Sequence, residues 1–207
     1  YNKVRIIGEI GINHDGEINK ALKLIKESKK IGVDIVKFQA FISEDLVLPN
    51  TKIAKYQKKN TNKKLSQLDL LKKYELSFSK IEKIISYCRK IKINYLFTAF
   101  DQKSLEFLIK KGCKSFKVAS PDIVDFKMLS LLAKKKCNIF LSTGMADIKE
   151  VIAATNYLIK KGLSKKKIAL FHCTSSYPAP VEDLNLEVID LFKEKFNFKI
   201  GYSDHSQ

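Results

Sequence analysis

The 207-residue sequence is long enough to bury a sizeable core, and its 45% hydrophobic content is typical of a globular protein rather than a disordered one. No run reaches the roughly 18 uninterrupted apolar residues that a membrane span needs, and residues 1–11 lack the features of a signal peptide. The net charge of +17 would suit nucleic acid, a membrane surface or an anionic substrate. The lysines, however, are spread over the polar faces and ends of predicted helices, which favours solvated surfaces and no nucleic-acid partner.

The cysteines predict reduced thiols. Cys88, Cys113, Cys137 and Cys173 lie far apart with no C-x-x-C spacing, which argues against a disulfide framework or a zinc site. We therefore expect a cytoplasmic protein. Cys173 directly follows His172, but neighbouring strand residues point to opposite faces, so we do not expect a catalytic pair.

Apolar runs of strand length alternate with amphipathic helical patterns along the chain. Runs rich in Ile, Val, Phe and Tyr predict buried parallel strands at 4–11, 34–41, 94–100, 115–120, 138–144, 168–174 and 198–203. Helical spacing predicts helices at 17–32, 78–92, 102–112, 126–136, 148–162 and 186–196. Asp101 and Asp147 are expected N-caps, and Gly32 is an expected C-cap. Residues 41–76 are predicted to form a long excursion between the second strand and its helix.

This alternation predicts an α/β fold with a parallel sheet. Its regularity fits a (β/α)8 TIM barrel, truncated after the seventh strand, better than an open sheet. Such a barrel typically has about 250 residues and an eighth strand. Because no linker divides the chain, we expect residues 1–207 to form one incomplete barrel domain.

Polar side chains at the carboxyl ends of barrel strands are active-site candidates. Lys37 and Lys117 are the most informative, because a lysine is almost never buried unless it is paired. Two lysines at one barrel mouth predict an anion between them, held also by nearby hydroxyl groups. Separate salt bridges to neighbouring carboxylates are the alternative. The hydroxyl candidates are Thr98, Ser120 and Ser142, and the carboxylates are Glu9, Asp122 and Asp204.

The histidines allow different roles. His14, in the turn "NHDG", is expected either to stabilise that turn or to act in catalysis. His172 lies in an apolar run and is expected to be a core histidine. His205 follows the last strand and is a candidate metal ligand or acid–base group.

Seven segments together resemble the sialic acid synthase family, whose members condense phosphoenolpyruvate with an N-acetylated hexose and release phosphate. They cover nearly the whole chain in the family's order: "IIGEIGINHDG", "GVDIVKFQAF", "LFTAFD", "FKVASPDI", "LSTGMA", "HCTSSYPAPVEDLNL" and "GYSDHS". Any one segment is weak, but their combination is highly specific.

The resemblance implies roles for individual residues. It implies that the phosphoenolpyruvate site uses Lys37, Thr98, Lys117, Ser120, Ser142 and Ser203. The acceptor sugar is expected near Ser175 and Tyr177, and His205 is implied as a ligand of a divalent metal, usually Mn²⁺, with Mg²⁺ or Co²⁺ as alternatives. Glu9 and Asp122 are implied as catalytic carboxylates, either of which would handle the attacking water.

The resemblance also implies a homodimer with a C-terminal antifreeze-like domain in the full-length protein. Neither that domain nor an eighth strand is present here, so we expect the fragment to be weakly active or inactive. Asp122, Ser175 and "FTAFD" depart from commoner family residues, which leaves the acceptor sugar open between N-acetylmannosamine and a diacetamido sugar. A non-catalytic module that binds a phosphorylated ligand, or serves assembly, is the alternative function.

Overall fold

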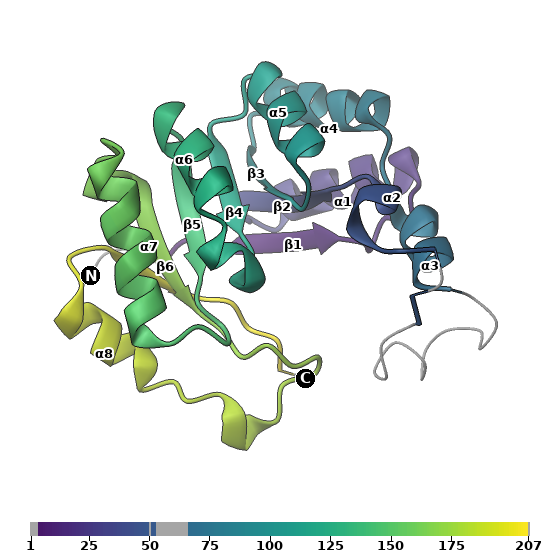
Figure 1. Cartoon of the computed structure of the whole chain (residues 1–207). Helices are drawn as coiled ribbons and strands as arrows, with labels where there is room; N and C mark the ends of the chain where they lie inside the picture. Colours follow the sequence, from purple (N-terminus) through teal and green to yellow (C-terminus); the bar gives the residue numbers. More distant parts are fainter. Residues whose placement is uncertain (1–3, 50, 53–65, 207) are drawn as a thin grey trace. The chain divides into compact units, whose positions relative to one another are not determined.

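The computed structural model describes residues 4–49, 51–52 and 66–206, and it divides into two compact units, Tyr1–Cys113 and Lys114–Gln207. Both units alternate parallel strands with helices, which confirms the predicted α/β class (Figure 1). Residues 53–65 of the predicted excursion lie outside the described residues. Within the described part of the chain, no helix combines the length and the apolar character required to cross a bilayer.

The first unit carries three parallel strands in the order β1-β2-β3. Its elements in chain order are β1 (Ile7–Gly11), α1 (Ile18–Lys30), β2 (Ile35–Ala40), α2 (Ser43–Leu46), α3 (Gln67–Tyr74), α4 (Phe78–Lys90), β3 (Asn94–Ala99) and α5 (Gln102–Lys110). The predicted helix at 17–32 ends as expected, because Gly32 follows the C-cap with a positive φ of 86°.

Strand register sorts the first unit's side chains onto two faces. Glu9 pairs with Lys37 across β1 and β2, and Gln39 pairs with Thr98 across β2 and β3. Because side chains alternate along a strand, these polar residues share one face. Phe38 and Phe97 occupy the other face, where both are fully buried with ring centroids 5.6 Å apart.

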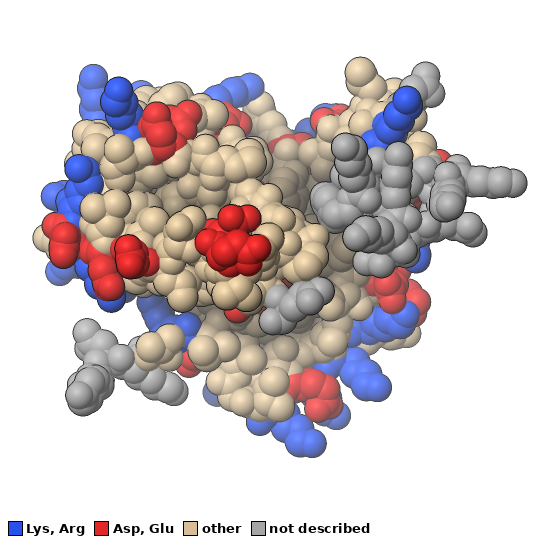
Figure 2. Space-filling model, turned by 90° about the horizontal axis from the view of Figure 1, so that it is seen from below, with Lys and Arg blue, Asp and Glu red and all other residues tan. Residues whose placement is uncertain are grey.

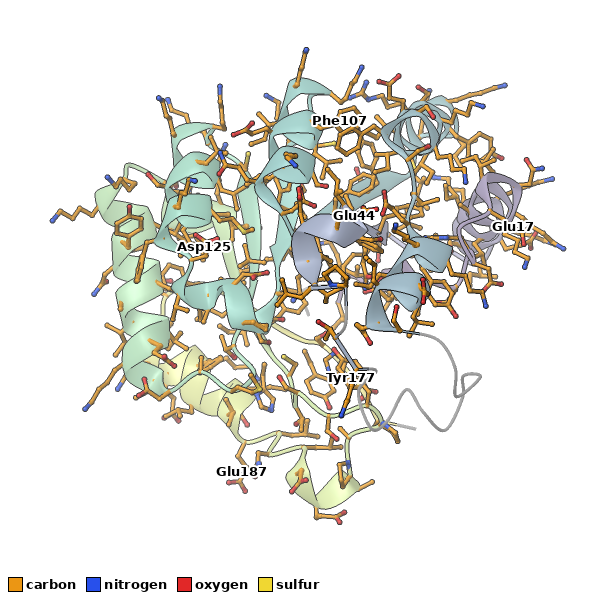
Figure 3. All side chains as sticks on the ribbon, turned by 45° about the vertical axis from the view of Figure 1, so that its right-hand side comes forward. Glu17, Glu44, Phe107, Asp125, Tyr177 and Glu187 are labelled. Atoms are coloured by element: carbon orange, nitrogen blue, oxygen red, sulfur yellow. The ribbon has the colours of Figure 1, made fainter. Side chains whose placement is uncertain are left out.

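Aromatic stacking and a shared aspartate hold α5 in place. Phe107 of α5, labelled in Figure 3, stacks on Phe78 of α4 at a centroid distance of 4.1 Å. Asp101 caps α5 by accepting hydrogen bonds from the amide and hydroxyl groups of Ser104, both at 2.7 Å. The same carboxylate accepts from the amide of Ile42 at 2.9 Å and so also fixes the segment after β2.

The second unit carries four parallel strands in the order β4-β5-β6-β7. Its elements are β4 (Ser115–Val118), η2 (Ser120–Val124), α6 (Phe126–Lys134), β5 (Asn138–Ser142), α7 (Ile148–Lys160), η3 (Lys165–Lys167), β6 (Ile168–His172), η4 (Val181–Asp183), α8 (Val188–Lys195) and β7 (Lys199–Tyr202). Asp147 is confirmed as the N-cap of α7, in a capping box with Glu150.

One face of the second sheet is an apolar core, on which Ile139, Leu141 and Leu170 are fully buried. The other face carries Lys117 and Ser142, with the ring of Phe171 between neighbouring strands. Gly201 of β7 is required here, because a Cβ atom at that position would lie 2.6 Å from the Phe171 ring. The second unit therefore presents its polar strand residues on the face opposite its hydrophobic core.

We predict that Asp101→Ala lowers the free energy of unfolding by about 2–4 kcal/mol, because three donors in two segments lose one acceptor. Asp147→Ala is the matched control: its exposed side chain accepts from one amide, that of Glu150, so about 1 kcal/mol is expected. Urea unfolding measures both, and equal losses would contradict the bridging role of Asp101.

Candidate functional site

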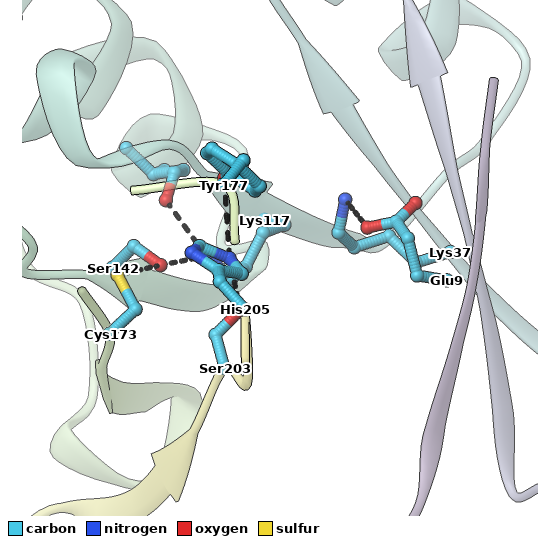
Figure 4. A network of polar contacts seen from close by, with 9 residues as sticks. Glu9, Lys37, Lys117, Ser142, Cys173, Tyr177, Ser203 and His205 are labelled. Atoms are coloured by element: carbon cyan, nitrogen blue, oxygen red, sulfur yellow. Dashed lines mark hydrogen bonds and ion pairs between the residues drawn. The ribbon is translucent and has the colours of Figure 1, made fainter. Parts of the chain in front are cut away.

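Lys117 and Ser142 form the centre of a polar cluster in the second unit (Figure 4). The lysine is only 8% exposed, and its ammonium group donates to the Ser142 hydroxyl and to the Val118 carbonyl at 3.4 Å. The same nitrogen lies 5.7 Å from the centroid of the Phe171 ring, within the range of a cation–π contact. A buried positive charge and a hydroxyl group thus lie together at the carboxyl ends of β4 and β5.

Ser120 and Cys173 extend this cluster. The Cys173 sulfur lies 3.3 Å from the Ser120 hydroxyl and 3.7 Å from the Ser142 hydroxyl. The Gly144 amide donates to Ser120 at 3.1 Å. Gly144 allows this approach only because it lacks a side chain: a Cβ atom there would lie 2.5 Å from the Ser175 hydroxyl and 2.9 Å from the Cys173 sulfur.

His205 lies in a second group of polar contacts in the same unit (Figure 4). Its Nδ1 lies 2.6 Å from the Thr174 carbonyl oxygen, which can only accept, so Nδ1 carries the donated proton. In the neutral ring, Nε2 therefore carries the lone pair and is a hydrogen-bond acceptor, 3.2 Å from the Tyr177 hydroxyl and 3.3 Å from the Ser203 hydroxyl. The Tyr177 ring stacks on the imidazole at 4.2 Å.

This orientation fits a metal ligand, since ligating histidines commonly donate their other N–H to a carbonyl. No described group of three or more His, Cys, Asp or Glu side chains is arranged to hold a metal ion. Asp204 is engaged locally instead, because it accepts from the Ser206 amide at 2.9 Å and from the Ser206 hydroxyl at 2.7 Å. These hydrogen bonds lower the pKa of Asp204.

Asp122 is held in an environment that favours its neutral form. Burial is the main cause that raises its pKa to about 6, the nearby Asp125 adds to the rise, and Lys117 opposes it. Its Oδ2 atom is buried without a hydrogen-bond partner among the described residues. A carboxyl group with such a pKa is suited to accept a proton near neutral pH.

In the first unit, Glu9 and Lys37 form an ion pair, as their register predicts. Lys37 thus has the salt-bridge partner that the sequence offered as the alternative to an anion. The Lys37 side chain is 13% exposed and that of Glu9 is 49% exposed. Thr98 is buried on the same face of the sheet.

The remaining histidines have local partners. His14 is buried and its Nδ1 accepts from the Gly16 amide at 2.9 Å, which supports the turn-stabilising role. Burial is the main cause that lowers the pKa of His14. His172 is a core histidine as expected, with Nε2 2.7 Å from the Leu184 carbonyl oxygen and its ring stacked on Tyr202 at 5.9 Å.

Cys173 is the residue that the sequence interpretation left out of the site. The Cys173 thiol contacts two of the predicted site hydroxyls, whereas His172 contacts the Leu184 carbonyl oxygen. The signal was available in the alternation of β6, which places position 173 on the same face as Phe171. Ser175 and Tyr177 are both exposed, and Ser175 lines a cavity of about 880 Å³ together with Thr174, Asp183 and Asn185.

Comparison with known proteins places this geometry in context. The sequence model of the NeuB family matches residues 24–207. An N,N'-diacetyllegionaminic acid synthase of Campylobacter jejuni is 40% identical over 205 residues, 99% of this chain and 61% of the relative. An N-acetylneuraminate-9-phosphate synthase of Drosophila melanogaster is 33% identical over 207 residues, 99% of this chain and 54% of the relative.

A solved structure agrees with these matches. The N-acetylneuraminic acid synthetase of Leptospira borgpetersenii, in complex with citrate, superimposes with a TM-score of 0.84 and 34% identity. The match covers 99% of this chain and 66% of the synthetase, so the chain spans about two thirds or less of these relatives. It confirms the predicted fold class, a TIM-barrel fold of which seven parallel strands are described here.

We predict that Asp122→Asn makes the chain more stable at neutral pH. The folded-state pKa of about 6 exceeds the ordinary value of 3.8, so the folded state binds more protons and loses stability as pH rises between these values. Asparagine cannot ionise and avoids this loss, a gain of about 1 kcal/mol at pH 7 after allowance for solvent screening.

Urea unfolding at pH 4 and pH 7 measures this effect. Asp190→Asn, which removes a carboxylate on the surface of α8, controls for the loss of one charge. An Asp122→Asn effect of the same size at both pH values would show that burial does not raise the pKa.

Proposed function

We propose, from the premise that the chain belongs to the NeuB family, that it is the barrel part of a sialic-type acid synthase. The proposed reaction condenses phosphoenolpyruvate, an acylated amino sugar and water to a nine-carbon sugar acid and phosphate. Relatives named as legionaminic acid and N-acetylneuraminate-9-phosphate synthases support this class of reaction. Because the chain spans only part of their length, the reaction is a proposal for the whole protein.

The buried pair of Lys117 and Ser142 is the observation that carries the proposal. The Lys117 ammonium group places a positive charge beside hydroxyl groups at the strand ends, a combination that suits an anion. A phosphate or carboxylate group of phosphoenolpyruvate would offset this charge, with hydroxyl groups of Ser142 and Ser120 as further donors. Ser203 completes the set in the second unit. Such fixed donors hold an anion at little reorganisation cost.

Lys37 and Thr98 are proposed as phosphoenolpyruvate contacts from the first unit. The ion pair with Glu9 gives Lys37 a carboxylate partner already in the structure. Binding of an anionic substrate to Lys37 would therefore exchange one carboxylate for another. Glu9, once released, would become available to the reacting groups, which is consistent with its proposed catalytic role.

The acceptor sugar is proposed to bind beside Ser175 and Tyr177. Both lie in the segment after β6, where the cavity of about 880 Å³ offers polar groups. A diacetamido sugar is the first acceptor to test, because the relative with 40% identity is named for an N,N'-diacetyl product. N-acetylmannosamine is the second.

His205 Nε2 is the group that would hold a divalent metal, for which Mn²⁺ is our first choice. When bound, such an ion would supply Lewis-acid polarisation of the sugar's carbonyl oxygen. The chain's own contribution at this position is to fix the ring through the Thr174 carbonyl, so that Nε2 keeps its lone pair.

The reacting carbons and water define the remaining roles. The methylene carbon of phosphoenolpyruvate would form a bond to the sugar's carbonyl carbon, and water would add to the neighbouring carbon before phosphate leaves. Asp122, with a pKa of about 6, is proposed to take the proton of that water, with Glu9 as the alternative base. Lys37 and Lys117 would hold the reactants in attack geometry.

Charge gives no comparable support for nucleic-acid binding. On the face shown in Figure 2, Lys and Arg side chains are dispersed, mostly near the margins, with Asp and Glu between them. A continuous basic patch is the usual footprint of a nucleic-acid site. We also propose a homodimer for the full-length protein, on the family resemblance alone.

The proposed reaction is tested by phosphate release from phosphoenolpyruvate. We expect release to depend on both Mn²⁺ and an acylated amino sugar, and to be strongest in the longest natural form of the protein. The panel contains the diacetamido sugars, N-acetylmannosamine and unacylated mannosamine as control. If no sugar in the panel stimulates release, the synthase proposal fails and the non-catalytic binding module is favoured.

We predict that Lys117→Met raises the KM for phosphoenolpyruvate at least tenfold, since methionine fills similar space without the charge. Lys199→Met removes an exposed lysine of β7 and serves as control. Unchanged KM for phosphoenolpyruvate in Lys117→Met would refute the assignment of the anion site.

A further inference from the structure

A continuous chain of hydrogen bonds connects three segments of the second unit, which follow or end β4, β5 and β6. It runs from the Gly144 amide to the Ser120 hydroxyl, from there to the Cys173 thiol, and from the thiol to the Ser142 hydroxyl. Lys117 donates to the same Ser142 oxygen. Figure 4 shows the end of this chain, where Cys173, Ser142 and Lys117 meet.

The donors and acceptors can be counted at Ser142. A serine hydroxyl has two lone pairs and one proton. The Lys117 ammonium group and the Cys173 S–H both donate to its oxygen, so both lone pairs are taken. The remaining hydrogen-bonding capacity of the Ser142 hydroxyl is its proton, which can bond only to an acceptor.

The same count fixes the direction at Ser120. The Gly144 amide can only donate, so the Ser120 oxygen is its acceptor. The Cys173 proton is committed to Ser142, so the Ser120 O–H donates to the sulfur, 3.3 Å away. Every donor in the chain therefore points the same way, toward Ser142.

The surroundings hold the thiol in this position. Cys173 is 4% exposed, and a Cβ atom on Gly144 would lie 2.9 Å from its sulfur. A sulfur reaches both hydroxyls at 3.3 and 3.7 Å, distances at which a smaller oxygen atom would bond only after a small shift. The buried thiol thus bridges the two hydroxyl groups.

We propose that Cys173 is a positioning residue of the anion site. Its thiol donates a hydrogen bond to the Ser142 oxygen and so directs the Ser142 proton toward a ligand that can only accept, the phosphate or carboxylate group of phosphoenolpyruvate. Cys173 acts through Ser142 and forms no bond to the ligand. This inference rests on the proposed function, because that function supplies the anion.

The test is a calorimetric titration of the chain with inorganic phosphate and with phosphoenolpyruvate, which measures the dissociation constant of each. Cys173→Ala and Cys173→Val should weaken binding about tenfold, since each removes the donor to Ser142. Cys173→Ser should stay within about threefold of the unchanged chain, because a hydroxyl both accepts and donates. Cys137→Ser, in a buried cysteine that is absent from the network, is the matched control.

The variants separate positioning from packing. Valine fills the space of the thiol without donating, whereas serine donates without filling it. Binding retained by Cys173→Val and lost by Cys173→Ser would show a packing role and overturn the inference. Melting temperatures identify any variant that fails to fold. If Cys173→Ala is that variant, the comparison of Cys173→Ser with Cys173→Val still tests the proposal.

The two proposals can fail separately. If the unchanged chain binds neither phosphate nor phosphoenolpyruvate, the anion site is wrong and the inference fails with it. If the unchanged chain binds and all Cys173 variants bind equally well, the inference alone is overturned. In turnover assays, Cys173→Val should raise the KM for phosphoenolpyruvate and change kcat to a smaller extent.

Discussion

The buried ammonium group of Lys117 is the constraint on which the polar side of the second unit depends. A charge that is removed from water must keep hydrogen-bond partners, or its burial would destabilise the fold. The chain meets this demand with Ser142, a strand-end hydroxyl on the neighbouring strand, and with an aromatic face below the lysine. Cys173 contacts Ser142, and Ser120 joins Cys173 to the amide of Gly144.

Much of the fold follows from local sequence signals. Alternating apolar runs and helical spacing place all seven described strands within three residues of their predicted starts and ends. Asp101 and Asp147 are N-caps as predicted, because side-chain capping is decided within one helical turn. What the local pattern could not supply was the second duty of Asp101, whose hydrogen bond to Ile42 joins residues distant in sequence.

In the candidate site, too, local sequence signals predicted some features, whereas contacts between distant residues could not be predicted. Family motifs and strand ends pointed to Lys117, Ser142 and His205, and these residues do lie in polar clusters. The motifs could not reveal that Lys37 would pair with Glu9, because that choice depends on the register of two strands. The alternation of β6 indicates the face on which Cys173 lies, but it could not reveal its partners, which come from β5 and from the segment after β4.

Gly144 has a consequence for how this protein family can diversify. No side chain fits at that position, since neighbouring atoms would lie within 3 Å of its Cβ. A side chain at position 144 would therefore displace Ser175 or Cys173. Tyr177, in the segment after β6, is by contrast exposed. Sequence variation in this segment is therefore accommodated more readily at an exposed position such as Tyr177 than at position 144.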